Sequence, residues 1–202
     1  MKFCKMIKVL DLGAGEFKVN REYLEKYLSK YLKLKEISIT SVDNKFEADI
    51  NYDLEKIPWN FAKDEEYDIV FASHILEHLN DTFSAMKEIY RILKKEGILF
   101  VRVPHFKSKF AFIDLTHKKF FAYESFDVFT KPNVEFCFEI LEKRFEYHDW
   151  RKSISLKGKL FALTYGKILE FFANRLPKIY ENLSIFAPIP ELVVLMRKKI
   201  CF

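Results

Sequence analysis

The hydrophobic pattern in the first half of the chain predicts a series of buried strands. Each is a short apolar run, often β-branched, and the runs lie at 8–12, 36–42, 67–72 and 98–103. A further strand-like piece spans 48–52, only a few residues beyond Asp43. A parallel crossover that contains a helix needs about a dozen residues. We therefore expect the helix between the second and third strands to be reduced or absent, and the third strand to be short and near the sheet edge.

Apolar residues at helical spacing fill the intervals between most of these strands. One helix is predicted from Val19 to Leu32. A second is predicted from Phe83 to Leu93, with Asp81 as its N-cap and Gly97 marking its end. Strands and helices that alternate in this way form an open parallel sheet covered by helices. The expected fold class is α/β, a Rossmann-like three-layer sandwich with a mostly parallel sheet.

The second half of the chain is less regular. A polar and aromatic loop (104–121) is followed by a short helix (123–129) and by a strand within 135–150. A largely helical insertion (153–190) and a last strand (191–197) follow. We expect the last strand to run antiparallel to the others. No domain boundary is visible, so residues 1–202 are predicted to form a single domain with a substrate-side or interface insertion.

Composition narrows the class of protein. Half of the 202 residues are hydrophobic, which excludes a disordered chain. The three cysteines are widely separated and suit a reducing compartment. No signal peptide and no run of ~18 apolar residues is visible, so we expect a cytoplasmic protein. The net charge of +5 is spread along predicted helices, which is typical of a solvated surface. Abundant Lys and Glu are compatible with a thermophilic source.

A glycine turn follows the first predicted strand, within the sequence Asp11-Leu12-Gly13-Ala14-Gly15. Glycine lets the backbone pass close to a ligand, and such a turn presents N–H groups at the edge where open sheets bind ligands. Asp43 ends the second strand and can accept hydrogen bonds from ribose hydroxyls. Dinucleotide sites have a third glycine at the position of Lys18. The pattern therefore disfavours a nicotinamide cofactor and favours an adenosyl-methionine one.

Three further motifs follow the glycine turn, in the order YDLEKIPW (52–59), SHILEHL (73–79) and RILKKEGIL (91–99). Together with VLDLGAG they resemble the class I methyltransferases, and within them the type-11 family, over roughly residues 7–130. The resemblance implies methyl transfer with S-adenosyl-L-methionine as the cofactor. Phe17 departs from the family, which often has another glycine there, so we expect a tighter loop or a partly capped pocket.

The resemblance also implies a set of cofactor contacts along one edge of the sheet. These are Asp11, Gly13, Ala14 and Gly15 at the methionine end, Asp43 at the ribose, Asp53 and Leu54 at the adenine, and Ser73 and His74 beside the sulfonium.

Histidines supply the alternatives to this interpretation. The segment from His74 to His78 matches the H-x-x-E-H pattern of one metalloprotease group, and His105, Asp114 and His117 match a two-His-one-carboxylate ligand set. Methyl transfer needs neither metal, so we expect none and interpret His78 as a capping or supporting residue. We expect His105 or His117 to act as the general base for an acceptor that must lose a proton.

The acceptor is not identified by the sequence. The basic aromatic loop and the apolar insertion favour a small-molecule or a glycan- or lipid-linked acceptor. Apolar and basic residues alternate over 157–176, which fits core packing, a homodimer contact or a peripheral membrane contact. A non-catalytic cofactor-binding or protein-interaction relative is the alternative function. An RNA methyltransferase is a further one, although nucleic acid is disfavoured because no N/D-P-P-Y-type motif is present.

Overall fold

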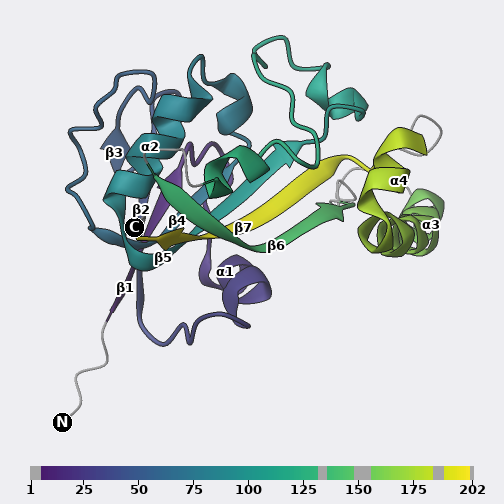
Figure 1. The fold of residues 1–202 in the computed structure, drawn as a ribbon, viewed down its shortest axis with the longest axis horizontal. Coiled ribbons are helices and arrows are strands. Elements are labelled where there is room, and N and C mark those ends of the chain that lie inside the picture. The colour runs from purple at the N-terminus through teal and green to yellow at the C-terminus, as the bar shows by residue number, and fades with distance from the viewer. Residues whose placement is uncertain (1–5, 132–135, 148–155, 184–188, 201–202) are drawn as a thin grey trace.

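The computed structural model describes residues 6–131, 136–147, 156–183 and 189–200. Across these residues the chain forms one sheet in the order β3-β2-β1-β4-β5-β7-β6 (Figure 1). The strands are β1 (Ile7–Leu12), β2 (Ile37–Asp43), β3 (Ile50–Asn51), β4 (Tyr67–Ser73), β5 (Leu93–Pro104), β6 (Cys137–Glu146) and β7 (Glu191–Lys199). The neighbours from β3 to β5 pair in parallel, whereas β7 pairs antiparallel with both β5 and β6. The expected α/β class and its reversed last strand are confirmed.

Helices cover both faces of this sheet. They are α1 (Arg21–Leu28), α2 (Thr82–Ile92), α3 (Leu156–Arg175) and α4 (Pro177–Leu183), with short 3-10 turns η1 (Leu76–His78), η2 (Lys109–Ala111) and η3 (Asp127–Thr130). In Figure 1, α1 lies on one face and α2 on the other, while α3 and α4 lie together beyond one end of β6 and β7. The three-layer arrangement expected from the alternating pattern is therefore present.

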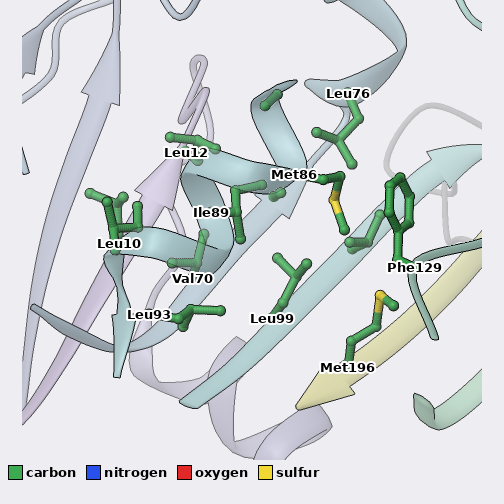
Figure 2. Close-up of a cluster of buried hydrophobic side chains, with 14 of the residues drawn as sticks. Leu10, Leu12, Val70, Leu76, Met86, Ile89, Leu93, Leu99, Phe129 and Met196 are labelled. Carbon is green, nitrogen blue, oxygen red and sulfur yellow. The ribbon is translucent and has the colours of Figure 1, made fainter. Parts of the chain in front are cut away.

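The core is divided by the sheet because successive strand residues point to opposite faces. On the α2 face, Leu10 and Leu12 pack with Met86 and Ile89 of α2 (Figure 2). On the α1 face, Val9 packs with Leu24 of α1 and with apolar residues of β4, β5 and β7. Both faces of the central strands are thus buried, as their continuous apolar sequences indicate.

The connection between β2 and β3 contains no helix, as expected. Asp49 ties it back to β2, because its carboxylate accepts hydrogen bonds from the backbone N–H and the hydroxyl of Ser41 at 2.8 and 2.7 Å. The backbone N–H of Tyr52 then donates to the carbonyl of Asp43 at 3.2 Å. The ends of β2 and β3 therefore lie side by side at the carboxyl edge of the sheet.

The end of the second helix was predicted wrongly. Helix α2 ends at Ile92 and β5 begins directly at Leu93, four residues before Gly97. The last carbonyls of the helix accept hydrogen bonds from the backbone N–H groups of residues 65 and 66, so the chain leaves the helix without a glycine cap. Gly97 lies inside the strand, where a Cβ would stand 2.8 Å from the carbonyl oxygen of Lys94.

Other boundaries also moved. Helix α1 starts at Arg21, with Asn20 as its N-cap, and spans only eight residues of the 19–32 prediction. The helix predicted at 123–129 is only the 3-10 turn η3. The insertion predicted at 153–190 contains α3 and α4, and its residues 153–155 and 184–188 lie outside the described residues. The strand predicted within 135–150 is β6, and residues 148–150 of that segment also lie outside the described residues. Among the described helices, none combines the length and apolar character needed to cross a membrane.

Candidate functional site

The turn after β1 has backbone conformations that favour glycine. Gly13 and Gly15 have φ angles of +69° and +59°. The N–H groups of Gly13 and Ala14 both donate to the carbonyl of Val42, which fixes the turn against β2. A Cβ on Gly13 would lie 2.6 Å from Ile75, whereas a Cβ on Gly15 would meet no atom within 4 Å. Gly13 is therefore needed for packing, and Gly15 leaves open space in which the backbone can approach a ligand.

Asp43 holds this turn from the end of β2. Its Oδ2 accepts the N–H of Gly15 at 3.0 Å, and its Oδ1 accepts the N–H groups of Lys45 and Phe46 at 2.7 and 3.0 Å. Burial opposes ionisation, but these hydrogen bonds outweigh it and hold the pKa of Asp43 below its ordinary value. A carboxylate offers about four acceptor positions. Three are used by backbone N–H groups of this chain, so Asp43 keeps about one acceptor position free.

Asp11 lies at the end of β1 and is almost completely buried. Its Oδ2 accepts the backbone N–H of Val19 at 2.8 Å, which ties the strand to the start of the first helix. Burial, with a smaller contribution from the negative charge of Asp43, raises the pKa of Asp11 to about 6. Burial therefore disfavours the charged form of this carboxyl group, and a positive group close to it would favour that form.

The two residues after β3 are placed differently from each other. Asp53 is partly exposed, and its Oδ1 accepts the N–H of Glu55 at 3.1 Å. Leu54 is buried, and its carbonyl accepts the indole N–H of Trp59 at 3.0 Å. Of this pair, Asp53 is the one whose side chain is available at the surface, while Leu54 is held in the core by Trp59.

Ser73 ends β4 and pairs with Arg102, and His74 follows with an unusual φ of +55°. The ring nitrogens of His74 lie between two buried carboxylates, with Nδ1 3.2 Å from Glu77 Oε1 and Nε2 3.1 Å from Glu191 Oε1. Burial lowers the pKa of His74, but these two partners raise it to about 10. His74 is therefore an imidazolium at neutral pH. This contradicts its role as a neutral zinc ligand in an H-x-x-E-H site.

A buried chain of charges continues from His74, and the sequence reasoning missed it. Glu191 forms a 3.1 Å ion pair with Arg102, whose guanidinium also lies 3.3 Å from Glu146 and 2.5 Å from the hydroxyl of Tyr27. Burial opposes ionisation of Glu146, but Arg102 and Tyr27 lower its pKa to about 2. Arg102 interrupts the apolar run of β5. A charge in a buried strand requires partners, and this was the signal available in the sequence.

His105 lies beneath α4 and has no exposed surface. Its Nε2 is 2.9 Å from Glu181 Oε1, and its ring packs edge-on against Phe106 and Phe145. Burial lowers the pKa of His105 despite the nearby carboxylate of Glu181. Among the described residues its Nδ1 has no hydrogen-bond partner. His105 is therefore closed to an acceptor in this structure.

His117 lies in a different place, beside the 3-10 turn η1. Its ring contacts that of His78 at a centroid distance of 4.7 Å, and its Nε2 is 3.9 Å from Asp114 Oδ2. The loop is joined to η1 because the N–H groups of Lys118 and Lys119 donate to the carbonyl of Glu77. His105, Asp114 and His117 therefore do not come together as the ligand set considered as an alternative, since His105 is paired with Glu181 of α4 instead.

A cavity of about 450 Å³ lies at the other edge of the sheet. It is lined by residues that include Ile7 at the start of β1 and Asp68 near the start of β4. Ligands of open parallel sheets bind at the carboxyl ends of the strands. This cavity is therefore separate from the glycine turn and from the ends of β2 and β4.

The strand order, the reversed β7 and the glycine turn tied to an acidic residue at the end of β2 define a class I methyltransferase fold. Residues 10–101 match the family model described as a methyltransferase domain, type 11. S-adenosylmethionine is the cofactor of this class, so the expectation drawn from the sequence motifs is confirmed.

Solved structures share the fold at low sequence identity. A putative methyltransferase in complex with the Haloferax volcanii Trm112 activator has a TM-score of 0.53 at 13% identity, covering 96% of this chain and 83% of that one. An S-adenosylmethionine-dependent methyltransferase from Archaeoglobus fulgidus gives 0.52 at 19%, covering 96% and 86%. A putative methyltransferase from Bacillus halodurans gives 0.51 at 17%, covering 95% and 92%. A search of curated protein sequences gave no significant match.

Proposed function

We propose that this chain transfers a methyl group from S-adenosylmethionine to an acceptor with a lipid-like apolar part, such as a lipid-linked glycan. The observation that carries the methyltransferase assignment is the Gly13–Gly15 turn, which is fixed to Asp43 and open at Gly15. When bound, the cofactor supplies a methyl group already activated by its sulfonium. The residues of the chain then have to bind, orient and exclude water.

The proposed cofactor contacts follow the carboxyl edge of the sheet. Asp11 and the turn of Gly13, Ala14 and Gly15 bind the methionine end, Asp43 the ribose, Asp53 and Leu54 the adenine, and Ser73 and His74 border the sulfonium. The burial and raised pKa of Asp11 support its place, because the ammonium group of the cofactor would stabilise the charge that burial disfavours. Asp43 contributes about one ribose contact, since its other acceptor positions are used.

A substitution at Gly15 tests cofactor binding directly. Asn tolerates a positive φ, so Gly15→Asn keeps the backbone while filling the open space with a side chain. We expect calorimetry to show S-adenosylhomocysteine binding to the wild type and its loss in Gly15→Asn, with an unchanged melting temperature. Lys18→Asn, on the same loop, is the matched control and should bind normally. Absence of binding to the wild type would refute the proposal.

For acceptor activation we propose His117 rather than His105. His105 is enclosed by α4 and paired with Glu181, whereas His117 lies on the loop that joins η1 at the carboxyl edge. That loop carries apolar side chains that are half or more exposed, namely Phe112, Ile113, Leu115 and Phe120. An apolar acceptor would cover them.

The helices α3 and α4 support a lipid-like acceptor independently. Ile168, Phe171, Phe172, Leu176 and Ile179 are each more than half exposed, so the described part of this insertion does not bury them in the core. The segment 156–183 has five basic and two acidic residues. Exposed apolar and basic residues together are typical of helices that lie on anionic membrane surfaces. We propose that α3 and α4 bring the site to such a surface.

Vesicle sedimentation tests this membrane contact. The wild type should pellet with vesicles containing phosphatidylglycerol and not with pure phosphatidylcholine vesicles, and salt should weaken the binding. Phe171→Ser with Phe172→Ser should reduce binding, whereas Phe83→Ser, an exposed aromatic on α2, should not. A dimer in light scattering that dissociates on the same double substitution would assign these side chains to self-association instead.

A further inference from the structure

Three side chains from two loops converge beside the 3-10 turn η1. Glu77, His78 and His117 each offer one potential ligand atom, and these atoms all lie within 4.8 Å of one another. Glu77 and His78 come from the turn after β4, and His117 comes from the loop after β5. The hydrogen bonds from Lys118 and Lys119 to the carbonyl of Glu77 hold the two loops together. Neither histidine pattern seen in the sequence contains this combination.

The hydrogen bonds of the two histidines select the same tautomer. Thr116 Oγ1 donates to Asp114 Oδ1 at 2.7 Å, so at 2.9 Å it accepts from Nδ1 of His78. Nδ1 of His117 lies 3.0 Å from the carbonyl of Ala111, which can only accept. In their neutral forms both imidazoles therefore carry the proton on Nδ1 and present the lone pair of Nε2. Metal-binding histidines are oriented in this way by carbonyl and hydroxyl or carboxylate partners.

Glu77 provides an independent observation that points to a ligand. Its side chain is 1% exposed, and Oε1 is 3.2 Å from Nδ1 of His74. Its Oε2 is buried and has no hydrogen-bond partner among the described residues. A buried acceptor that is left without a partner destabilises the fold, and more so when it is charged. A cation beside Oε2 would remove this destabilisation.

We propose that Glu77, His78 and His117 bind one divalent transition-metal ion of the Zn²⁺ type. Two imidazoles and a carboxylate form the ligand set of zinc and non-haem iron sites that keep positions open. Ligand atoms around a tetrahedral ion lie about 3.3 Å apart, so the three side chains close by up to about 1.5 Å through small rotations. If the proposed function holds, an oxygen of the acceptor takes an open position, and His117 acts through the ion.

Metal binding can be measured without any activity assay. The protein is stripped with a chelator and dialysed against Zn²⁺, and bound metal is counted per chain; Co²⁺ serves as the spectroscopic probe. We expect one Zn²⁺ per wild-type chain, none in His117→Gln, and intact binding in Lys119→Gln, which changes a neighbouring side chain outside the cluster. Mg²⁺ should not compete, because it prefers oxygen ligands.

A second variant separates ligation from misfolding. Thr116→Val removes the acceptor for Nδ1 of His78 without removing a ligand, and loss of such a partner weakens metal binding about 10–100-fold. Less than one Zn²⁺ per wild-type chain, or wild-type affinity in both His117→Gln and Thr116→Val, would overturn the site. Calorimetry with S-adenosylhomocysteine distinguishes the two proposals. Zn²⁺ binding without nucleoside binding refutes only the methyltransferase function, and the reverse refutes only the metal site.

Discussion

The buried carboxyl group of Asp11 predicts that one substitution will stabilise the fold and weaken the cofactor site. Asp11 is 3% exposed, and burial raises its pKa from 3.8 to about 6. The folded state therefore binds this proton more tightly than the unfolded state. The contribution of Asp11 to the free energy of unfolding is therefore most favourable below pH 3.8, declines as the pH rises, and has been lost above about pH 6. The difference corresponds to about 3 kcal/mol at ~1.4 kcal/mol per pH unit, taken as an upper value.

Asp11→Asn removes the charge and keeps an oxygen that can accept the N–H of Val19. We expect its free energy of unfolding to exceed that of the wild type by up to about 3 kcal/mol at pH 8, and by less at pH 5, where part of the wild-type group is already protonated. The carboxylate is the proposed partner of the ammonium of the cofactor. Because hydrogen bonds to charged groups contribute about 1.5–3 kcal/mol, affinity for S-adenosylhomocysteine should fall about 10–100-fold.

Urea denaturation at pH 5 and pH 8, with calorimetry at pH 8, measures both effects. Asp43→Asn is the control of opposite sign. The pKa of Asp43 is lowered by folding, so removal of its negative charge should destabilise the fold at pH 8. A lower stability of Asp11→Asn at pH 8 would refute the argument from burial. Unchanged affinity with raised stability would leave the burial argument standing and remove Asp11 from the cofactor site.

Three further substitutions test the packing that supports the site. Arg102→Met removes the buried guanidinium that contacts both Glu146 and Glu191, and should lower the free energy of unfolding by about 3–5 kcal/mol in urea. Adding Glu146→Gln should restore part of this loss. Gly97→Ala places a Cβ 2.8 Å from the Lys94 carbonyl and should cost about 1–3 kcal/mol, seen as a lower melting temperature. Asp81→Ala removes the cap that accepts the N–H of residue 84 and should cost about 1 kcal/mol, again by denaturant midpoint.

The parts of the fold that follow from local sequence were predicted well. The turn at Gly13 and Gly15 and the N-cap Asp81 depend on backbone conformation within a few residues, so composition at those positions is informative. The absent helix before β3 followed from chain length alone. Gly97 was misleading because hydrogen bonds from residues 65 and 66 end the helix in place of a glycine. Such partners come from elsewhere in the chain and leave no local pattern.

The site was harder to predict because its partners are far apart in sequence. Arg102 reaches Tyr27 of α1 across 75 residues and Glu146 of β6 across 44, and the second contact requires the β5-β7-β6 order. The two predicted bases illustrate the same point. His105 and His117 lie on one loop, yet α4 covers the first and η1 receives the second. Only the tertiary arrangement distinguishes them.

The buried charges that run from Glu146 through Arg102 and Glu191 to His74 also explain where a cation would be retained. Each buried carboxylate has a basic neighbour: Glu146 contacts Arg102, and Glu191 lies between Arg102 and His74. Glu77 ends the series, and its Oε2 is the oxygen left without a partner among the described residues. The other end is compensated by further basic groups, since Lys26 and Arg144 also contact Glu146. His74 neutralises Glu77 only through Oε1, so an ion bound beside Oε2 would continue the alternation of charge at the place where His78 and His117 also lie.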